Sequence, residues 1–524
     1  MINNSRPEYV FIRVCIVGLQ AIAPLAVLYT VFELLFLPAP SRLPTALRIW
    51  LRVEAIFYLF LSIPYRSYLQ RDATHPPLKS KQDRQELFSR VVNNTEREQL
   101  ERHVCFWFKG AKFDEIGRED IKSWVSWAFF EGRTEHLDDE ELEEYVRGLE
   151  GMLGRTFQDG KGKAVPLRLT LDPIEMQHRS LLWYLVRIIN PNTIAPPVLI
   201  PVRKMVGIVD LITYVRMWFY GYQFYRQSLS DFLTLFPFRP IALTARHRSP
   251  AKHLTYWLRP HTSKKRLPIV FIHGIGIGLY PYVDFLHDLQ SQDHQDGQVG
   301  ILALELMPIC FRITHPMPSK DNLCAEILQI LRYHNITSFV LATHSYGSVI
   351  TTHMLSNPTL QPKISSILLI DPVTFLLHTP DVAYNFTTRK PKEANEWQLW
   401  YFASKDPGVA HTLGRHFHWA QNALWLEEEL VPLVRQGLRV TVILSGRDLI
   451  VDAEAVGRHL ASGASKAGRG TMSDDRSDGW KNEPWQGEGL ELLWFEDTDH
   501  AQVFDSKTKR KRLLHVVARY CTGK

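Results

Sequence analysis

The chain has 524 residues, and its 61 Lys and Arg against 55 Asp and Glu give a net charge of +6. Hydrophobic residues make up 45% and charged residues 22% of the sequence, which excludes wholesale disorder, collagen and coiled coil. So mild a charge balance gives no argument for nucleic acid as a partner. The five cysteines are odd in number and widely scattered, so they predict neither a disulfide framework nor a metal site.

A long apolar stretch lies near the start of the chain. Residues 9–37 carry charge only at Arg13 and Glu33, which lie towards the two ends of the stretch. About 20 apolar residues are enough for a helix to span a bilayer core. No small-residue cleavage site follows, which favours a retained anchor over a signal peptide. A buried core helix is the alternative.

A second apolar stretch, residues 49–64, contains Arg52 and Glu54 and is compatible with the second half of a hairpin or with an interfacial helix. Basic residues follow it, and the positive-inside rule then places the main body on the cytosolic side, for example at the endoplasmic reticulum or a lipid droplet. The glycosylation sequons are short chance-prone patterns and do not change this expectation. Residues 1–70 are therefore expected to form a membrane anchor.

Residues 80–238 are expected to form a helical accessory region. Apolar residues recur at helical spacing between residues 82 and 105, and the acidic run from Asp138 is typical of the first turn of a helix. The stretch 214–226 mixes aromatic residues with Arg. We expect it to pack in a core or under a lid, with interfacial membrane contact as the alternative.

From about residue 240 to 524 the pattern changes to continuous apolar strands that alternate with helices. This pattern predicts an α/β fold with a mostly parallel sheet covered on both faces. The expected strands are 267–273, 299–306, 338–343, 364–370, 440–444 and 490–495, and the expected helices are 282–290, 321–334 and 347–355. Two insertions interrupt the pattern: 381–429, which is rich in aromatic residues and His, and 462–489, whose Gly, Ser and Asp content predicts flexibility.

The strand that ends at Ala342 runs into Thr343-His344-Ser345-Tyr346-Gly347-Ser348, after which a helix begins. This strand–turn–helix resembles the nucleophile elbow G-x-S-x-G of the α/β-hydrolase superfamily. Thr343 departs from the first Gly of the motif, whereas Gly347 matches the second. The resemblance implies an α/β-hydrolase fold, with Ser345 as the nucleophile and His344 and Gly347 in supporting positions.

The remaining members of a Ser–Asp–His triad follow in the chain order of that superfamily. Asp448 lies in a Gly turn after a strand, and His500 lies in an acidic loop after the last strand. A Ser hydroxyl needs a base such as neutral imidazole to take its proton, and the acid orients that imidazole. Asp371, at the end of the preceding strand, is the alternative acid, whereas Asp452 is expected to cap a helix.

Three histidines compete with His500 for the role of base, and all lie in the first insertion, where packing or pocket lining is the more common role: His411, His416 and His418.

The sequence His273-Gly274-Ile275-Gly276 follows the first long strand. It resembles the oxyanion loop of the same superfamily. The resemblance implies that the backbone N–H groups of Ile275 and Tyr346 bind the developing oxyanion, with His273 and Gly274 supporting the loop. It implies no metal and no cofactor.

The resemblance implies a serine hydrolase of esterase or lipase type that works through an acyl-serine intermediate. The aromatic insertion 381–429 occupies the usual position of a lid, and a lid beside an anchor favours a hydrophobic acyl ester or a lipid as substrate. Acyltransferase or thioesterase chemistry would use the same residues. The combination of anchor, helical segment and hydrolase is similar to membrane-associated α/β-hydrolase proteins of fungal type.

Two other functions are compatible with parts of the sequence. Gly274, Gly276 and Gly278 follow a strand, and Glu305 ends the next, as in a nucleotide-binding oxidoreductase, but Leu279 stands where that fingerprint needs its third Gly. Thr343 is the one feature that favours a non-catalytic, hydrolase-like membrane binding protein.

Overall fold

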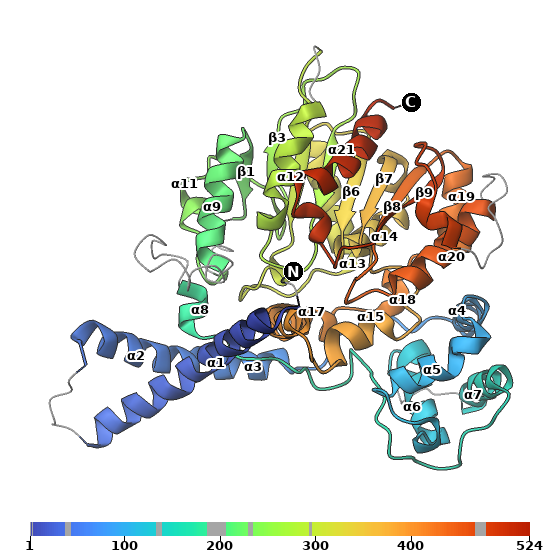
Figure 1. Cartoon of the computed structure of the whole chain (residues 1–524), viewed down its shortest axis with the longest axis horizontal. Helices are drawn as coiled ribbons and strands as arrows, with labels where there is room; N and C mark the ends of the chain where they lie inside the picture. The colour runs from blue at the N-terminus through green and yellow to red at the C-terminus, as the bar shows by residue number, and fades with distance from the viewer. Residues whose placement is uncertain are drawn as a thin grey trace.

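The computed structural model describes residues 2, 4–36, 43–132, 139–185, 206–228, 234–292, 296–466 and 478–523. Figure 1 shows a sheet domain above two separate helical parts, a long hairpin on one side and a cluster of shorter helices on the other. The helices of the insertion 381–429 lie between these two parts and the sheet.

The sheet has nine strands in the described part of the chain, in the order β2-β1-β3-β5-β4-β6-β7-β8-β9. Their bounds are β1 Gln223–Arg226, β2 His247–Arg248, β3 Thr255–Arg259, β4 Ile269–Ile272, β5 Ile301–Glu305, β6 Phe339–His344, β7 Ile364–Ile370, β8 Arg439–Ser445 and β9 Leu490–Phe495. Strand β3 is antiparallel to both of its neighbours, and β5 to β9 with β4 form one parallel set. The prediction of a mostly parallel sheet is confirmed.

Helices cover both faces of this sheet because the strands are apolar on both sides. Phe271 and its neighbours pack against α9 (Val206–Phe219), α12 (Val283–Asp288) and α21 (Lys507–Cys521). Ile272, the next residue, faces the opposite layer of α13 (Lys320–Tyr333), α14 (Gly347–Leu355) and α20 (Ala453–Lys466). The predicted strands and helices of residues 267–370 and the last two strands are therefore confirmed in type and order.

The sheet begins earlier than the expected boundary at residue 240. Strand β1 pairs with β3 and comes from the stretch 214–226, which the helical assignment covered. Part of this stretch is core, since Tyr222 and Phe224 are buried. Trp218 and Phe219, however, are exposed, so the expectation of core or lid packing is wrong for the end of α9. Strands of two to five residues leave too little alternation to be found in a sequence.

The accessory region contains the expected helices, with α4 Lys81–Asn93, α5 Arg97–Trp107, α6 Arg118–Phe130 and α7 Asp139–Leu153. Its apolar core is continuous with the core beneath the insertion 381–429. The second insertion is partly ordered: α20 extends to Lys466 and a short 3-10 turn spans Asp478–Asn482. The expected flexibility of 467–477 lies outside the described residues.

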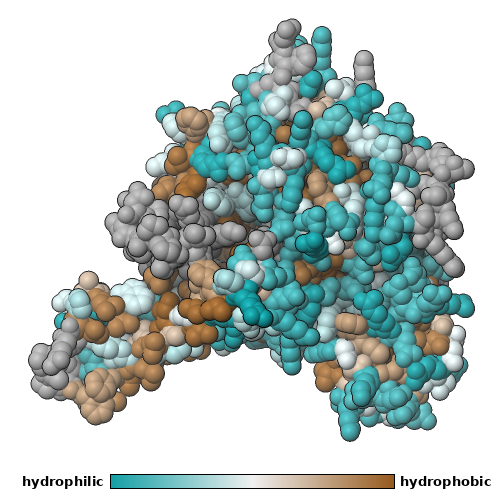
Figure 2. Space-filling view, viewed as in Figure 1, coloured by the Kyte–Doolittle hydropathy of each residue, from teal (hydrophilic) through white to brown (hydrophobic). Residues whose placement is uncertain are grey.

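The N-terminal hairpin consists of α1 (Arg6–Leu35) and α2 (Thr45–Phe57), and α2 continues through a π-helical turn into α3 (Ile63–Leu69). Among the described helices, α1 is the one long and apolar enough to cross a membrane, and 28% of its most apolar window is buried, which is unlike a core helix. Figure 2 shows apolar side chains along the outer surface of this arm. Arg52 and Glu33 neutralise each other by a bidentate pair, at 2.8 Å for both contacts.

The base of the hairpin rests on the insertion 381–429. The guanidinium of Arg13 lies 3.7 Å from the ring centre of Trp397 in α16 (Ala394–Leu399), and the backbone N–H of Ile2 donates to Gln398 at 2.9 Å. Helix α16 also carries Asn395, whose side-chain amide donates to Asp499 at 3.0 Å. Residues far apart in the sequence thus connect the start of the chain to the loop before His500.

Candidate active site

Ser345 occupies the tight turn between β6 and α14. Its φ of +52° is left-handed, a strained conformation for a non-glycine residue that is common at functional turns. A Cβ on Gly347 would lie 2.6 Å from the carbonyl oxygen of Ile272, and one on Gly274 would lie 2.6 Å from Cβ of Ser345. Both glycines are therefore required by the close approach of this turn to β4 and the loop that follows it.

Thr343 is accommodated at the position where the motif has Gly. Its side chain is fully buried, and its hydroxyl lies 3.0 Å from that of Thr351 in α14. The hydroxyl is thus satisfied inside the protein, and the departure from the motif leaves the geometry of the turn intact.

The three predicted triad residues meet at the carboxyl ends of β6, β8 and β9. His500 Nε2 lies 2.8 Å from Ser345 Oγ, and His500 Nδ1 lies 2.7 Å from Asp448 Oδ2. All three side chains are almost fully removed from solvent. A neutral imidazole that donates from Nδ1 to the carboxylate accepts from the serine at Nε2, which is the tautomer that activates a nucleophile.

The acid loop is fixed against the loop that carries His500. Gly446 donates to the carbonyl of Phe495 at 2.9 Å, and a Cβ at this position would lie 2.7 Å from the carbonyl oxygen of Glu496. Asp448 Oδ1 accepts from the backbone N–H groups of Ile450 and Val451 at 2.7 and 3.0 Å. Its other oxygen is left for His500, so the loop sets the direction of the carboxylate.

Asp371, the alternative acid, holds a different partner. Its Oδ2 accepts from the backbone N–H of Ala501 at 2.9 Å, next to His500. Burial, together with the charge of Asp448, raises the pKa of Asp371 to about 7. The hydrogen bond to the imidazole is made by Asp448, and Asp371 instead fixes the His loop.

The charge state of His500 reflects several carboxylates. Burial lowers its pKa, but the charge and hydrogen bond of Asp448, with smaller contributions from Asp371 and Asp499, outweigh burial and raise the pKa to about 9. His344, whose ring centre lies 5.1 Å from that of His500, has a pKa lowered by burial and by the two neighbouring histidines. A neutral His344 adds no charge beside Ser345.

The backbone N–H groups of Ile275 and Tyr346 have no hydrogen-bond partner in the described part of the chain, and both residues line the cavity at Ser345. Tyr346 precedes the first residue of α14, where the helix dipole favours negative charge. A pair of free amides beside a serine hydroxyl is the arrangement that stabilises a developing oxyanion.

Buried histidines hold the loop that carries Ile275. His273 donates from Nδ1 to the carbonyl of Gly274 at 2.7 Å and accepts at Nε2 from Leu306 N–H at 3.0 Å, so it is a neutral structural residue. The hydroxyl of Tyr282 lies 2.8 Å from His344 Nδ1 and accepts from Gly274 N–H at 3.2 Å. Sequence reasoning missed Tyr282, since no motif marks it.

Ser345 opens into a narrow apolar cavity of about 50 Å³. The insertion 381–429, which is predicted to be a lid, contributes Phe386, Phe417 and Trp419 to the lining of this cavity. Trp107 of α5 and Trp127 of α6 line the same cavity. The accessory helices therefore complete the wall around Ser345. No local pattern predicts this role, because these tryptophans lie more than 200 residues from Ser345 in the chain.

No family model matches the sequence, and no curated protein matches it. Among solved structures, the chain is similar to a bacterial membrane phospholipase A described as a virulence factor (12% identity, TM-score 0.36, 61% of this chain and 93% of that chain). It is also similar to a carboxylesterase from Bacillus subtilis (9%, 0.34, 59% and 98%) and to carboxyl esterase 2 from the fungus Tuber melanosporum (14%, 0.32, 51% and 80%). These neighbours are esterases and lipases of the α/β-hydrolase superfamily.

The fold is an α/β-hydrolase fold. This assignment rests on the sheet with its two helical layers and on the strand–turn–helix at Ser345. At such low identity the likeness to solved structures is one of fold, and the site is described by its own geometry.

Glu305, the acid that a nucleotide-binding oxidoreductase would need to bind a ribose, has a different role in this fold. Glu305 is buried and accepts from Arg239 at 2.8 and 3.1 Å and from the hydroxyl of Thr255 at 2.9 Å. Its carboxylate is therefore occupied by internal partners and is not presented to a ribose.

The rival histidines lie away from Ser345. Burial, together with neighbouring charges, lowers the pKa of both His411 and His416 to about 4, and their rings pack 4.9 Å apart. His418 lies beside His75 and Glu131 rather than beside the serine.

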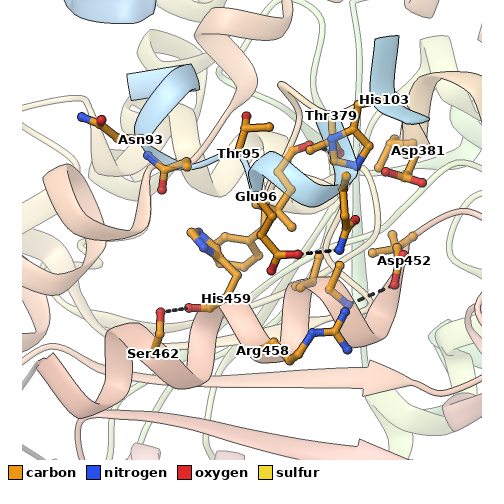
Figure 3. A pocket seen from close by; sticks show the side chains of 18 of the residues that line it. Asn93, Thr95, Glu96, His103, Thr379, Asp381, Asp452, Arg458, His459 and Ser462 are labelled. Carbon is orange, nitrogen blue, oxygen red and sulfur yellow. Dashed lines mark hydrogen bonds between the residues drawn. The ribbon is translucent and has the colours of Figure 1, made fainter. Parts of the chain in front are cut away.

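A second, larger cavity of about 640 Å³ lies between the α4–α5 turn, the start of the lid and α20, and both polar and apolar side chains line it (Figure 3). Glu96, Asp381, Asp452 and Arg458 are among the residues that line it. Val382 lines both cavities, so this cavity and the one at Ser345 adjoin at its side chain.

Proposed function

We propose that the protein is a membrane-associated serine hydrolase that cleaves esters with apolar acyl groups through an acyl-Ser345 intermediate. The observation that carries the proposal is the unbroken hydrogen-bond chain from Asp448 through His500 to Ser345 at the strand ends. The free amides of Ile275 and Tyr346 beside the serine support it further.

In the proposed reaction Ser345 Oγ attacks the acyl carbonyl carbon while His500 Nε2 takes the hydroxyl proton. The oxyanion accepts hydrogen bonds from Ile275 and Tyr346 N–H, each of which is worth about 3–4 kcal/mol in known enzymes. His500 returns its proton to the alkoxide as the ester C–O bond breaks. Water, deprotonated by His500, then cleaves the acyl-serine, and the carboxylic acid leaves as Oγ regains its proton. Asp448 stabilises the imidazolium at both stages.

The substrate class follows from the two cavities. The space at Ser345 is walled almost entirely by apolar side chains, which suits an acyl chain. It is much smaller than the roughly 300–1,000 Å³ of a pocket for a drug-sized ligand. Short acyl groups therefore fit the present arrangement, and longer ones require the lid to move. We assign the polar head group to the larger neighbouring cavity, which the same movement would join to the first, because Val382 of the insertion lines both.

The hairpin provides the membrane attachment. Gln20 of α1 donates to Gln177 of the body at 3.0 Å, and Glu54 of α2 accepts from Leu181 at 2.7 Å, so both arms leave the body at these points. From Gln20 to the end of α1 the helix reaches about 22 Å at 1.5 Å per residue. A bilayer core measures about 30 Å. We infer that the hairpin enters the membrane from the cytosolic side and returns without crossing.

Labelling with a fluorophosphonate probe tests the proposed chemistry. Wild-type protein should be labelled, and both Ser345→Ala and His500→Ala should lose the label while circular dichroism shows them folded. A panel of esters graded by acyl length then defines the substrate. Failure to label folded wild-type protein would sink the proposal and would favour a non-catalytic binding protein.

A further inference from the structure

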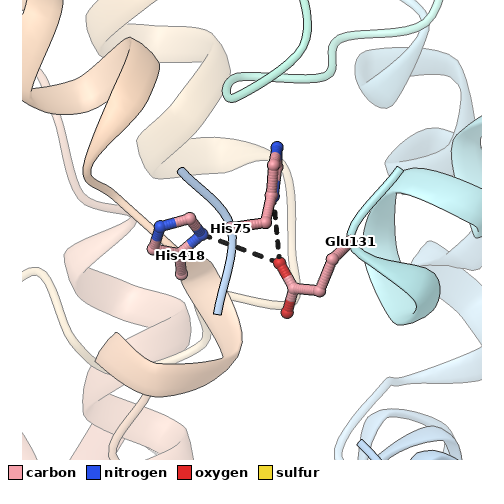
Figure 4. Close-up of side chains that lie close together, drawn as sticks. All are labelled: His75, Glu131 and His418. Atoms are coloured by element: carbon pink, nitrogen blue, oxygen red, sulfur yellow. Dashed lines mark hydrogen bonds and ion pairs between the residues drawn. The ribbon is translucent and has the colours of Figure 1, made fainter. Parts of the chain in front are cut away.

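Three side chains from distant segments meet at the junction of the accessory region and the lid (Figure 4). His75 lies in the connection between α3 and α4, Glu131 follows the last residue of α6, and His418 precedes α18 (Trp419–Asn422). One donor atom of each lies within 4.8 Å of the other two.

Two of the three distances in this cluster match those between ligands of one metal ion. His75 Nδ1 lies 3.4 Å and His418 Nδ1 lies 3.6 Å from the same oxygen, Glu131 Oε2. Zinc binds His nitrogen and carboxylate oxygen at about 2.0–2.2 Å, and the edge of a tetrahedron with such bonds is about 3.3–3.6 Å. Direct N–H···O hydrogen bonds are shorter, about 2.7–3.2 Å.

A pair of ordinary hydrogen bonds explains the cluster less well. His418 Nδ1 is buried and has no hydrogen-bond partner among the described residues, which is costly unless something else binds it. The three side chains remain 13–15% exposed, which leaves one side of the cluster open to water.

We propose that His75, Glu131 and His418 bind one zinc ion, with water in the remaining position. Two imidazoles and one carboxylate form a donor set that suits zinc. The ion would join the accessory region to the lid. Its lid ligand, His418, stands between Phe417 and Trp419, which line the cavity of Ser345. This role is structural and does not depend on the proposed hydrolysis.

Metal content and cobalt spectroscopy of the full-length protein test the site. Protein dialysed against zinc and then against metal-free buffer should retain about one equivalent by plasma mass spectrometry. Replacement by Co²⁺ should give the intense visible absorption of a four-coordinate site. His418→Ala and Glu131→Gln should each weaken binding by more than about 100-fold, since loss of even an outer partner costs 10–100-fold. The exposed His515→Ala serves as the matched control and should leave binding unchanged.

A folded wild-type protein that retains no zinc, or one whose zinc is unaffected by His418→Ala and Glu131→Gln, would overturn the proposal. Melting temperatures with and without chelator add a second measurement that needs no substrate. Zinc should raise the melting temperature of wild type and of His515→Ala, and should leave that of Glu131→Gln unchanged.

Discussion

The indole N–H of Trp419 donates to the backbone carbonyl of Ala128 at 3.0 Å, so a lid residue beside the serine cavity is held by accessory helix α6. The lid and the accessory helices are therefore linked by a hydrogen bond in the wall that they form around the cavity.

Trp419→Phe keeps the packing of this side chain but removes its hydrogen bond. We expect a loss of about 1 kcal/mol in the free energy of unfolding, together with a changed preference for acyl length. Denaturant unfolding and the ester panel measure the two effects. Trp480→Phe is the matched control, since this buried indole has no hydrogen-bond partner within the described residues. Equal stability losses in both variants would contradict the role of the bond to Ala128.

The two buried acids near His500 should respond differently to neutralisation. Asp448→Asn removes the partner of Nδ1, and in a triad such a change lowers kcat by about 10⁴-fold. Asp371→Asn leaves that partner in place and keeps an acceptor for Ala501 N–H, so kcat should fall by less than roughly tenfold. Steady-state kinetics of both variants decides between the acids, and the reverse order would assign the role to Asp371.

The pH profile should report the raised pKa of His500. The neutral imidazole is the active base, so kcat/KM should rise with pH and level off above about 9. Asp371→Asn removes one negative charge nearby and should shift this limb towards acid. The sign for stability is opposite: protonated His500 stabilises the fold fully below its ordinary pKa, near 6.5, and this contribution is lost as pH rises through 9. If neither Asp371→Asn nor Asp448→Asn shifts the pH at which kcat/KM levels off, His500 is not the titrating base.

Enlarging the cavity should change which esters are cleaved. Phe386→Ala removes a buried ring from the wall beside Ser345, so kcat/KM for longer acyl chains should increase relative to that for acetyl esters. Phe113→Ala removes an equally buried ring in the accessory core that does not line the cavity. Both should destabilise by about 3–5 kcal/mol, and only the first should alter the acyl preference.

Membrane attachment should depend on the outer face of the hairpin. Leu28 and Phe60 are 65% and 76% exposed. Leu28→Glu together with Phe60→Glu should release the protein from vesicles, because a charged residue in the bilayer is costly. Val165→Glu, on an exposed valine of the body, is the control and should remain bound. Retention of the double variant would place the attachment elsewhere, for instance on Trp218 and Phe219.

The sequence was most informative where chemistry depends on neighbours in the chain. Ser345, Asp448 and His500 each follow a buried strand, and parallel strands bring their carboxyl ends to one edge, so three local patterns were enough to predict the cluster. Tyr282 and Asn395 show the limit, because each acts through a partner dozens of residues away. The meeting of His75, Glu131 and His418 depends on how two helical parts pack, and no spacing in the chain encodes that distance.

The same limit explains the missed strands. Strand β1 has only four residues, and its aromatic side chains are equally compatible with a buried helix. It is recognised as a strand by its pairing with β3, which the sequence does not reveal. Composition left a hairpin and an interfacial helix as alternatives for residues 49–64. The contacts of Gln20 and Glu54 with Gln177 and Leu181 in the body could not be predicted from it.

The first turns of α1 contact α16, so the hairpin also supports part of the sheet domain's insertion 381–429. The guanidinium of Arg13 packs on the ring of Trp397 in α16. Asn395 of the same helix donates a hydrogen bond to Asp499, the residue before His500. A displacement of the hairpin would therefore be transmitted through α16 to the loop that carries His500. Removal of residues 1–70 would take away the contact between Arg13 and Trp397, so we expect the truncated protein to differ from the full chain at the position of the His500 imidazole.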